Sequence, residues 1–190
     1  MQDCAAQLLY EEIQPVGVET PSRKSSDPSF FSLSDGKKIA LLAISDVDQD
    51  SEIATASRRA ELNIAIANAH IHAHLIVCLV HWGMENSERV TDQQHELARW
   101  LIDRGVDLVV GSHPHCVQPL DFYHGRPIAY SLGNLVFDGA PTVASWNHGA
   151  LLEVDLNEEA KISSVSLIPV VLEDGFPRVE VTESYRFGSR

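Results

Sequence analysis

The sequence is short of cysteine and has no long apolar run, and each shortage excludes a class of protein. Cys4, Cys78 and Cys116 are too few, and too unevenly spaced, for the disulfide framework of a small secreted domain. No stretch approaches the roughly 18 to 20 apolar residues of a membrane-spanning helix. The residues after Met1 also lack the charged and apolar regions of a signal peptide. The sequence as given therefore predicts a soluble chain.

Cationic side chains are also scarce. Fourteen Lys and Arg residues stand against 27 Asp and Glu residues, which gives a formal net charge of −13. This charge argues against nucleic acid or an anionic membrane surface as a partner, because both would be repelled. A local metal site would still allow an anionic small substrate. With 190 residues and 44% hydrophobic content, the chain can bury one core and is expected to be one domain or part of one.

The spacing of apolar residues predicts an α/β half followed by an antiparallel β half. The predicted helices cover residues 3–12, 57–69 and 92–104. The predicted strands cover residues 13–19, 30–33, 38–45, 77–80, 106–110, 117–123, 126–131, 151–156 and 162–172. The third helix is the best signalled, because Thr91 and Gln94 form a capping box and Gly105 follows its end.

Two histidine segments follow the β-branched runs 77–80 and 106–110. The first is His-Trp-Gly-Met-Glu at 81–85 and the second is Gly-Ser-His-Pro-His at 111–115. Strand ends are where α/β folds place their chemistry, and neutral imidazole is the commonest metal-binding side chain. In an extended chain the two histidines of the second segment would face the same way. The pattern favours a Zn²⁺, Mn²⁺ or Fe site, with ordinary polar loops as the alternative.

Three further side chains near these segments are candidates. Glu85 could orient a ligand or act as a general base, although a solvated loop acid is as natural. Asn134 follows a strand and could hold a ligand or an oxyanion, although Gly133 and Asn134 could equally form a plain turn. Cys116 follows the second histidine segment, but the extended chain would turn its side chain away from His115, so a ligand role is disfavoured.

The remaining histidines are expected to lie outside the site. The His-x-His-x-His run at 70–74 ends a predicted helix, where i and i+2 point apart and cationic histidine is favoured by the helix dipole. His95 is expected on a solvated helix face, and His124 in a hairpin turn. His148 could reach the site only if the loop 138–149 folds back.

Four segments together strongly resemble the bacterial capsule synthesis protein CapA family. They are His-Trp-Gly-x-Glu at 81–85, Gln-x-x-x-Ala with Leu-Ile-Asp-x-Gly-Val-Asp at 94–107, Gly-Ser-His-Pro-His-x-x-Gln-Pro at 111–119, and Tyr-Ser-Leu-Gly-Asn-Leu-Val-Phe-Asp at 130–138. The resemblance extends to poly-γ-glutamate biosynthesis proteins within the calcineurin-like metallophosphoesterase superfamily. It covers most of the chain from about residue 8 to residue 154.

This resemblance implies an α/β fold, the C-terminal portion of a four-layer α/β/β/α metallophosphoesterase-like sandwich with mixed sheets. Residues 1–172 would be the partial domain and 173–190 a C-terminal tail. His81 and His113 would bind one divalent ion (Mn, Fe or Zn) and His115 a second. Glu85 and Asn134 would be the catalytic candidates. The implied substrate is a phosphate ester or an anionic polymer, and the implied partner is a capsule or polyglutamate synthesis complex.

The sequence also departs from the family pattern. The Gly-Asp, Asn-x-x-Glu, Asn-Asn-His and Asp-x-Gly segments, which would supply acidic and bridging ligands, are not found ahead of the first predicted helix. Ser112 stands where the superfamily often has histidine, and Asn86 where the family often has an aromatic residue. Three imidazoles are too few to hold two ions firmly, so the chain alone is expected to bind metal weakly and to hydrolyse little. A non-catalytic assembly or polymer-binding component is the alternative. Membrane contact is expected only through a segment outside these residues.

Overall fold

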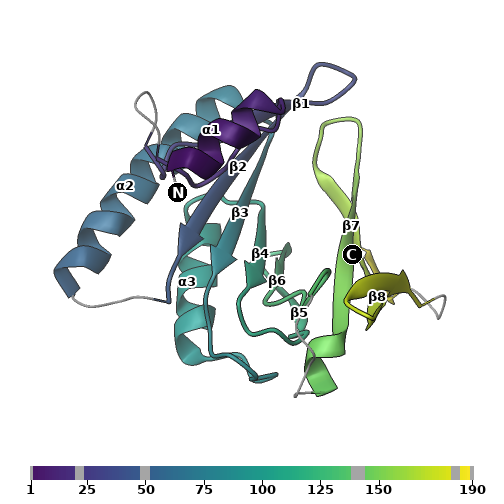
Figure 1. Ribbon diagram of the computed structural model, residues 1–190. Helices are drawn as coiled ribbons and strands as arrows, with labels where there is room; N and C mark the ends of the chain where they lie inside the picture. Colours follow the sequence, from purple (N-terminus) through teal and green to yellow (C-terminus); the bar gives the residue numbers. More distant parts are fainter. Residues whose placement is uncertain (1, 20–23, 48–51, 138–143, 181–184, 189–190) are drawn as a thin grey trace.

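The computed structural model describes residues 2–19, 24–47, 52–137, 144–180 and 185–188. It contains helices packed on one sheet, and a second sheet packed on the opposite face (Figure 1). In chain order the elements are α1 (Gln2–Tyr10), β1 (Ser29–Ser32), β2 (Lys38–Ser45), α2 (Glu52–His72), β3 (Leu75–His81), α3 (Asp92–Asp103), β4 (Leu108–Ser112), β5 (Leu120–Tyr123), β6 (Arg126–Ala129), the 3-10 turn η1 (Ala144–Asn147), β7 (His148–Leu156), β8 (Ile162–Glu173), β9 (Phe176–Val179) and β10 (Tyr185–Gly188).

The first sheet has the strand order β1-β2-β3-β4-β6-β5. Strands β2, β3, β4 and β6 run parallel, while β1 and β5 pair antiparallel at the two edges. Helices α2 and α3 connect the parallel strands, because such strands need a crossover that returns the chain to the same end of the sheet. The predicted hairpin and strand-helix-strand units are confirmed. Their strands carry continuous apolar runs because both faces are covered.

The second sheet is antiparallel, with the order β10-β8-β7 and with β9 paired to β8. Strand β9 pairs with residues 170–173 of β8, and β10 pairs with residues 164–167. Both therefore lie along the edge of β8 that β7 leaves open. Residues 176–179 and 185–188, which fall in the segment 173–190 expected as a C-terminal tail, thus form strands of this sheet.

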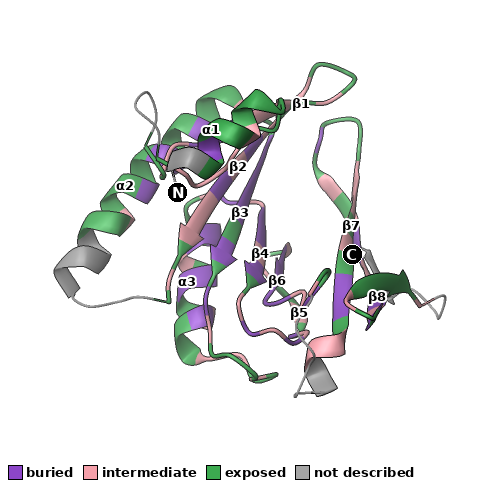
Figure 2. Cartoon of the chain, in the orientation of Figure 1, coloured by how far each residue is buried: buried purple, intermediate pink, exposed green. Residues whose placement is uncertain are grey.

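Two apolar cores hold the layers together, and Figure 2 shows buried positions along β3 and β4. The larger core lies between the first sheet and α2 and α3, and includes Leu42, Ile66 and Leu101. The smaller core lies between the sheets, where Leu75, Val77 and Leu108 meet partly buried side chains of β7 and β8. The mixed α/β fold is confirmed. The described residues form three layers, and no described helix covers the outer face of the second sheet (Figure 1).

Helix α3 begins as predicted. The Thr91 hydroxyl accepts from the Gln94 amide N–H at 3.2 Å, and the Gln94 Oε1 accepts from the Thr91 N–H at 3.0 Å. This capping box satisfies two of the backbone donors that a helix start leaves without partners. The helix ends at Asp103 and is followed by the C-cap Arg104 and then by Gly105, whose φ of 100° suits glycine.

The strand predicted at 13–19 is wrong, since these residues form irregular backbone with a bend at 16–17. Gly17 has a φ of 75° and lies against Ala43, where an added Cβ would approach the Ala43 Cβ to 2.7 Å. The close contact and the left-handed backbone together require glycine and prevent a regular strand. In the described part of the chain, no helix is long and apolar enough to cross a membrane.

Candidate metal centre

The carboxyl edge of the first sheet brings three histidines together. His81 ends β3, and its partner across the strand pair is Ser112, the last residue of β4. His113 follows directly, and its ring centroid lies 4.5 Å from that of His81. The His115 ring centroid lies 6.4 Å from that of His113. Because parallel strands end at the same edge, residues 32 positions apart become neighbours here.

The backbone of the second histidine segment is not extended. His113 has a φ of 102° and His115 a φ of 58°, in the left-handed region that non-glycine residues rarely adopt. The extended backbone predicted for this segment is therefore wrong, although the two ring centroids lie only 6.4 Å apart. The turn between them is held at Pro114, whose carbonyl accepts from the Asn86 N–H at 2.8 Å. Such strained backbone occurs most often at functional sites.

His81 points to the side of the second sheet. Side chains alternate along a strand, so Leu75, Val77, Leu79 and His81 share one face of β3. Their exposure rises toward the site, from 3% for Leu75 and 8% for Val77 to 37% for Leu79. The two sheets therefore leave the space beside His81 open to solvent or to a ligand.

His115 is held by the second polar candidate, Asn134. The Asn134 Oδ1 lies 2.8 Å from the His115 Nδ1, and the Asn134 Nδ2 donates to the Trp146 carbonyl at 3.0 Å and to the His115 carbonyl at 3.5 Å. The Asn134 side chain is buried. Both amide protons are engaged, which leaves no donor for an oxyanion. The geometry favours a positioning role for Asn134 over direct catalysis.

Aromatic rings cover the rest of His115. The Trp146 ring centroid lies 4.9 Å from the imidazole, and the Phe137 centroid lies 5.6 Å away. The Trp146 indole N–H donates to the Asn86 side-chain oxygen, which ties η1 to the loop after β3. Aromatic rings packed beside an imidazole restrict its rotation. Trp146, Phe137 and Asn134 therefore hold the His115 ring from several sides.

Glu85 does not join this cluster. Its side chain is exposed in the loop after β3, and no hydrogen bond involving it occurs among the described residues. The neighbouring Asn86, with a φ of 62°, makes the contacts that fix this loop. The geometry therefore favours the interpretation of Glu85 as a solvated loop acid.

The surroundings of His81 favour its neutral ring. Burial lowers the pKa of His81, and the neighbouring rings of His113 and His115 lower this pKa further. Desolvation penalises a charge on His81, and so does the closeness of the other two rings, so the uncharged form of His81 is favoured. The uncharged imidazole is the form that binds a metal ion.

The donor set matches the imidazole share of a two-metal site but not a complete one. Across the described ranges, no group of three or more His, Cys, Asp or Glu side chains is arranged to hold a metal ion. Three imidazole nitrogens suit zinc, manganese or iron, yet a stable site needs about four ligands per ion. The carboxylates of a dinuclear centre would have to come from outside the described residues.

Other motif residues serve packing, which the sequence patterns alone did not reveal. Trp82 is fully buried and its indole N–H donates to the Tyr130 carbonyl at 2.8 Å. Gly111 lies against both, since an added Cβ would come within 2.0 Å of the Tyr130 carbonyl oxygen. The Trp after His81 and the Gly before Ser112 therefore let β3, β4 and the 130–134 segment meet closely.

A buried pair of glutamines holds the loop that carries Glu85. The Gln94 Nε2 donates to the Gln118 Oε1 at 2.9 Å, and the Gln118 Nε2 donates to the Ser87 carbonyl at 2.8 Å. Both glutamines are about 1 to 2% exposed. The two glutamines of the family segments could have signalled this role, because buried amides require partners.

The remaining histidines lie elsewhere. Those of the 70–74 run contact the Arg104 carbonyl, the Phe30 ring and the Lys38 N–H, each at a different place. His124 occupies the predicted turn with a φ of 50°. The expectation of a solvated His95 is wrong, because its Nδ1 lies 2.7 Å from the Tyr130 hydroxyl. His148 starts β7 and is exposed.

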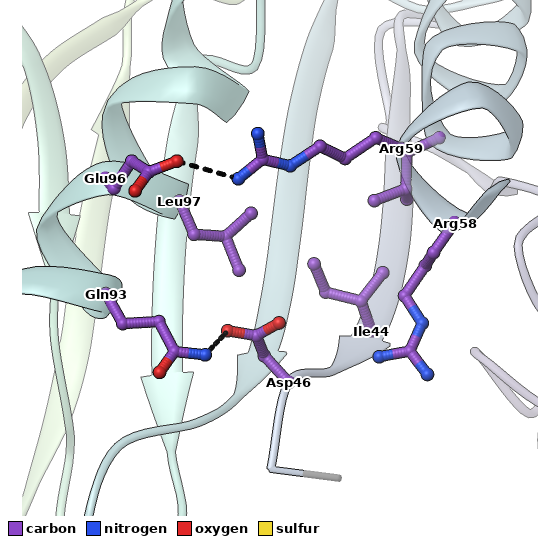
Figure 3. A pocket seen from close by; sticks show the side chains of 8 residues that line it. Ile44, Asp46, Arg58, Arg59, Gln93, Glu96 and Leu97 are labelled. Carbon is purple, nitrogen blue, oxygen red and sulfur yellow. Dashed lines mark hydrogen bonds and ion pairs between the residues drawn. The ribbon is translucent and has the colours of Figure 1, made fainter. Parts of the chain in front are cut away.

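A small cavity of about 100 Å³ lies between the end of β2 and the helices α2 and α3 (Figure 3). Its polar side chains are hydrogen-bonded: Arg59 donates to Glu96 at 2.9 Å, Gln93 donates to Asp46 at 3.1 Å, and Arg58 donates to the Ser45 carbonyl at 2.8 Å. The Asp46 backbone N–H also donates to the His81 carbonyl at 2.7 Å. This arrangement braces the strand end that carries His81.

The fold and the histidine cluster together define the class of protein to which the chain belongs. The chain is an α/β protein with a mixed sheet packed on an antiparallel sheet, and with imidazoles gathered at the carboxyl edge of its parallel strands. Comparison with known sequences then identifies the family. Residues 1–139 match the pattern of the family described as bacterial capsule synthesis protein PGA_cap, and the chain belongs to this family.

Several relatives carry informative names. The chain is 37% identical over 145 residues to the PGA biosynthesis protein CapA of Bacillus subtilis, covering 73% of this chain and 38% of that protein. It is 35% identical over 107 residues to the capsule biosynthesis protein CapA of Bacillus anthracis, covering 56% of this chain and 25% of that protein. A probable polyglutamine synthesis accessory protein of Mycobacterium tuberculosis is 33% identical over 64 residues, 34% of this chain and 17% of that protein. The chain thus spans well under half the length of these relatives.

Proposed function

We propose that the chain acts in capsule or poly-γ-glutamate biosynthesis and carries the histidine side of a metal-dependent phosphoesterase-type hydrolase. The observation that supports this most directly is the meeting of His81, His113 and His115 at one edge of the sheet, with ring centroids 4.5 and 6.4 Å apart. Membership of the capsule synthesis family and the names of the relatives support the biosynthetic role.

In this proposal His81 and His113 hold one divalent ion and His115 holds the other. A pair of bound divalent ions supplies an activated water and offsets charge on the oxygens of a phosphate ester. The chain's own residues position these ligands: β3 and β4 place His81 beside His113, and Asn134 holds the His115 ring. Acidic ligands would come from outside the described residues.

The substrate of this site would be a phosphate ester or an anionic polymer. The formal charge of −13 would repel such a substrate from most of the surface. A bound cation at the histidine cluster would reverse the local sign and concentrate an anion there. The exposed face beside Leu79 and His81 gives access from the side of the second sheet.

The first test is metal content. The chain is equilibrated with Mn²⁺ or Zn²⁺, freed of unbound metal and analysed by elemental analysis. A His113→Ala/His115→Ala variant should lose the bound metal, because it removes two of three imidazoles. His124→Asn is the matched control, since it removes a histidine from the hairpin turn and asparagine tolerates the left-handed backbone there. Equal metal content in the wild type and the double variant would contradict the ligand assignment.

A non-catalytic assembly or polymer-binding component is the second candidate. The observation that favours it is the lack, across the described residues, of the carboxylates that a complete two-metal site requires. Hydrolysis of a generic phosphodiester that disappears in the double histidine variant would support the enzyme. Retention of poly-γ-glutamate on a column of the immobilised protein, unchanged in that variant and without any hydrolysis, would support the binding component.

A further inference from the structure

A chain of hydrogen bonds decides which nitrogen of His115 is available to a ligand. The Asn134 Nδ2 faces two carbonyl oxygens, those of Trp146 and His115. A carbonyl can only accept, so this end of the amide must be the NH₂ group. The orientation of the amide is therefore fixed, and its Oδ1 faces the His115 Nδ1 at 2.8 Å.

The amide orientation then fixes the imidazole. The Asn134 Oδ1 can only accept, so in the neutral ring the His115 Nδ1 must carry the proton. The Nε2 is left with its lone pair free. Contacts with Trp146 and Phe137 hold the plane of the ring. The neutral His115 thus presents a single nitrogen in a fixed direction.

Ser112 sets the position of the ring proton of His81 in a similar way. The Ser112 hydroxyl donates to the Val80 carbonyl at 3.5 Å, and its oxygen lies 3.3 Å from the His81 Nδ1. A hydroxyl whose proton points to a carbonyl accepts from the imidazole, which places the His81 proton on Nδ1. These distances are longer than those at Asn134, so the constraint is weaker.

We infer that Asn134 and Ser112 are positioning residues that set the neutral tautomers of His115 and His81, so that each ring presents its Nε2 to its own ligand. The inference rests on the proposed function for the identity of that ligand, a divalent cation in each case. It also explains two residue choices: Asn134 in the Ser-Leu-Gly-Asn segment, and serine at position 112. Histidines that bind metals commonly donate their other ring N–H in this way, and loss of the acceptor weakens metal binding roughly 10- to 100-fold.

The direct test is nitrogen NMR of the metal-free protein labelled with ¹⁵N-histidine, at a pH where the rings are neutral. Two-bond and three-bond couplings show which ring nitrogen carries the proton. We expect Nδ1–H for His115, which is the reverse of the preference of free histidine. In Asn134→Leu the His115 signal should move to the Nε2–H form, whereas Asn134→Asp keeps an acceptor and should keep Nδ1–H. The signals of His95 and His124 report whether each variant is folded.

The serine is tested separately. Ser112→Ala should shift the tautomer balance of His81 and leave that of His115 unchanged. The hydrogen bond of Ser112 to His81 and that of Asn134 to His115 share no atom. A wild-type His115 that carries its proton on Nε2, or an unchanged signal in a folded Asn134→Leu variant, would overturn the inference.

Zn²⁺ titration of the same variants separates this inference from the proposed function. Weaker binding by about 10- to 100-fold in Asn134→Leu, with Asn134→Asp much closer to the wild type, would support both. Correct tautomers without any metal binding would leave the inference standing and refute the metal centre. Metal binding by a protein whose metal-free His115 carries its proton on Nε2 would support the metal centre and refute the inference.

Discussion

At the residue scale, the candidate centre depends on side chains held in unfavourable backbone. His113, with a φ of 102°, has a conformation that only glycine adopts without strain. Its ring nevertheless lies beside His81, at a centroid distance of 4.5 Å. The strained backbone and the place of His113 within the histidine cluster together support the proposed functional role of this residue.

Replacing His113 tests this strain. We expect His113→Gly to be more stable than His113→Ala by about 1 kcal/mol, because glycine relieves the strain that alanine keeps. Urea unfolding of the two variants gives the difference. The matched control is Asn68, exposed within α2, where alanine should be more stable than glycine by about 1 kcal/mol. The same sign at both positions would contradict the strained backbone at His113.

Tyr130 gives a residue-scale prediction for alkaline pH. Burial raises the pKa of its phenol to about 12, the Asp121 carboxylate adds to the rise, and Arg99 opposes it. Between pH 10 and 12 the unfolded chain loses this proton first, so the free energy of unfolding falls as the pH rises. The fall attributable to Tyr130 is about 2 kcal/mol by pH 12. Tyr130→Phe should flatten this part of the stability profile, and identical profiles for both proteins would refute the prediction.

At the scale of elements, α3 and the loops around it form one polar unit. The capping box at Thr91 uses the same Gln94 side chain that donates to Gln118, and Gln118 in turn holds the Ser87 carbonyl. These hydrogen bonds join the start of α3 to the loop after β3 and to the residues that follow the second histidine segment. Each amide in this unit is buried and paired, so losing one partner leaves another unsatisfied.

Two substitutions at the helix start measure its contribution. Thr91→Ala should lower the free energy of unfolding by about 1 kcal/mol, because it removes the acceptor of the Gln94 N–H. Thr91→Ser keeps a hydroxyl at the same place and should lie close to the wild type. Denaturant unfolding monitored by circular dichroism provides the comparison, and equal losses in both variants would argue against the cap.

At the scale of the whole molecule, two apolar cores hold the three layers together, and they differ in how fully their side chains are buried. The core under α2 and α3 is closely buried, with Ala40, Cys78 and Leu101 at 0% exposure. Contacts between the two sheets weaken toward the histidine edge, where Leu79 is 37% exposed. The more fully buried core therefore lies on the helix side of the first sheet, and the more exposed contacts lie between the two sheets near the histidines.

Thiol labelling measures this difference in burial. Cys4 is exposed, whereas Cys78 and Cys116 are 0% and 2% exposed. Burial also raises the pKa of Cys78 to about 12, so little reactive thiolate forms at neutral pH. The native protein should react rapidly at one thiol per chain, and denatured protein at three. Rapid labelling of Cys78, located by peptide mass analysis, would show that the larger core opens readily.

The sequence by itself determined the elements that depend on local patterns. The buried runs of β3 and β4 predict strands, the capping box predicts the start of α3, and an Asp-Gly turn predicts the β1–β2 hairpin, because each signal lies within a few residues. It also singled out the three histidines. The irregular 13–19 segment was missed, because its backbone is set by the contact of Gly17 with Ala43.

Only the tertiary structure decided what the candidate side chains do. Glu85 and Asn134 looked alike as loop polar residues, yet one is exposed and the other is buried against His115. The Trp146 carbonyl that fixes the Asn134 amide lies 12 residues further along the chain. Such contacts form when the segment after β6 pairs with the start of β7, through the bridge between Gly133 and Gly149, which brings η1 beside His115. Their geometry follows from long-range packing, which no local spacing encodes.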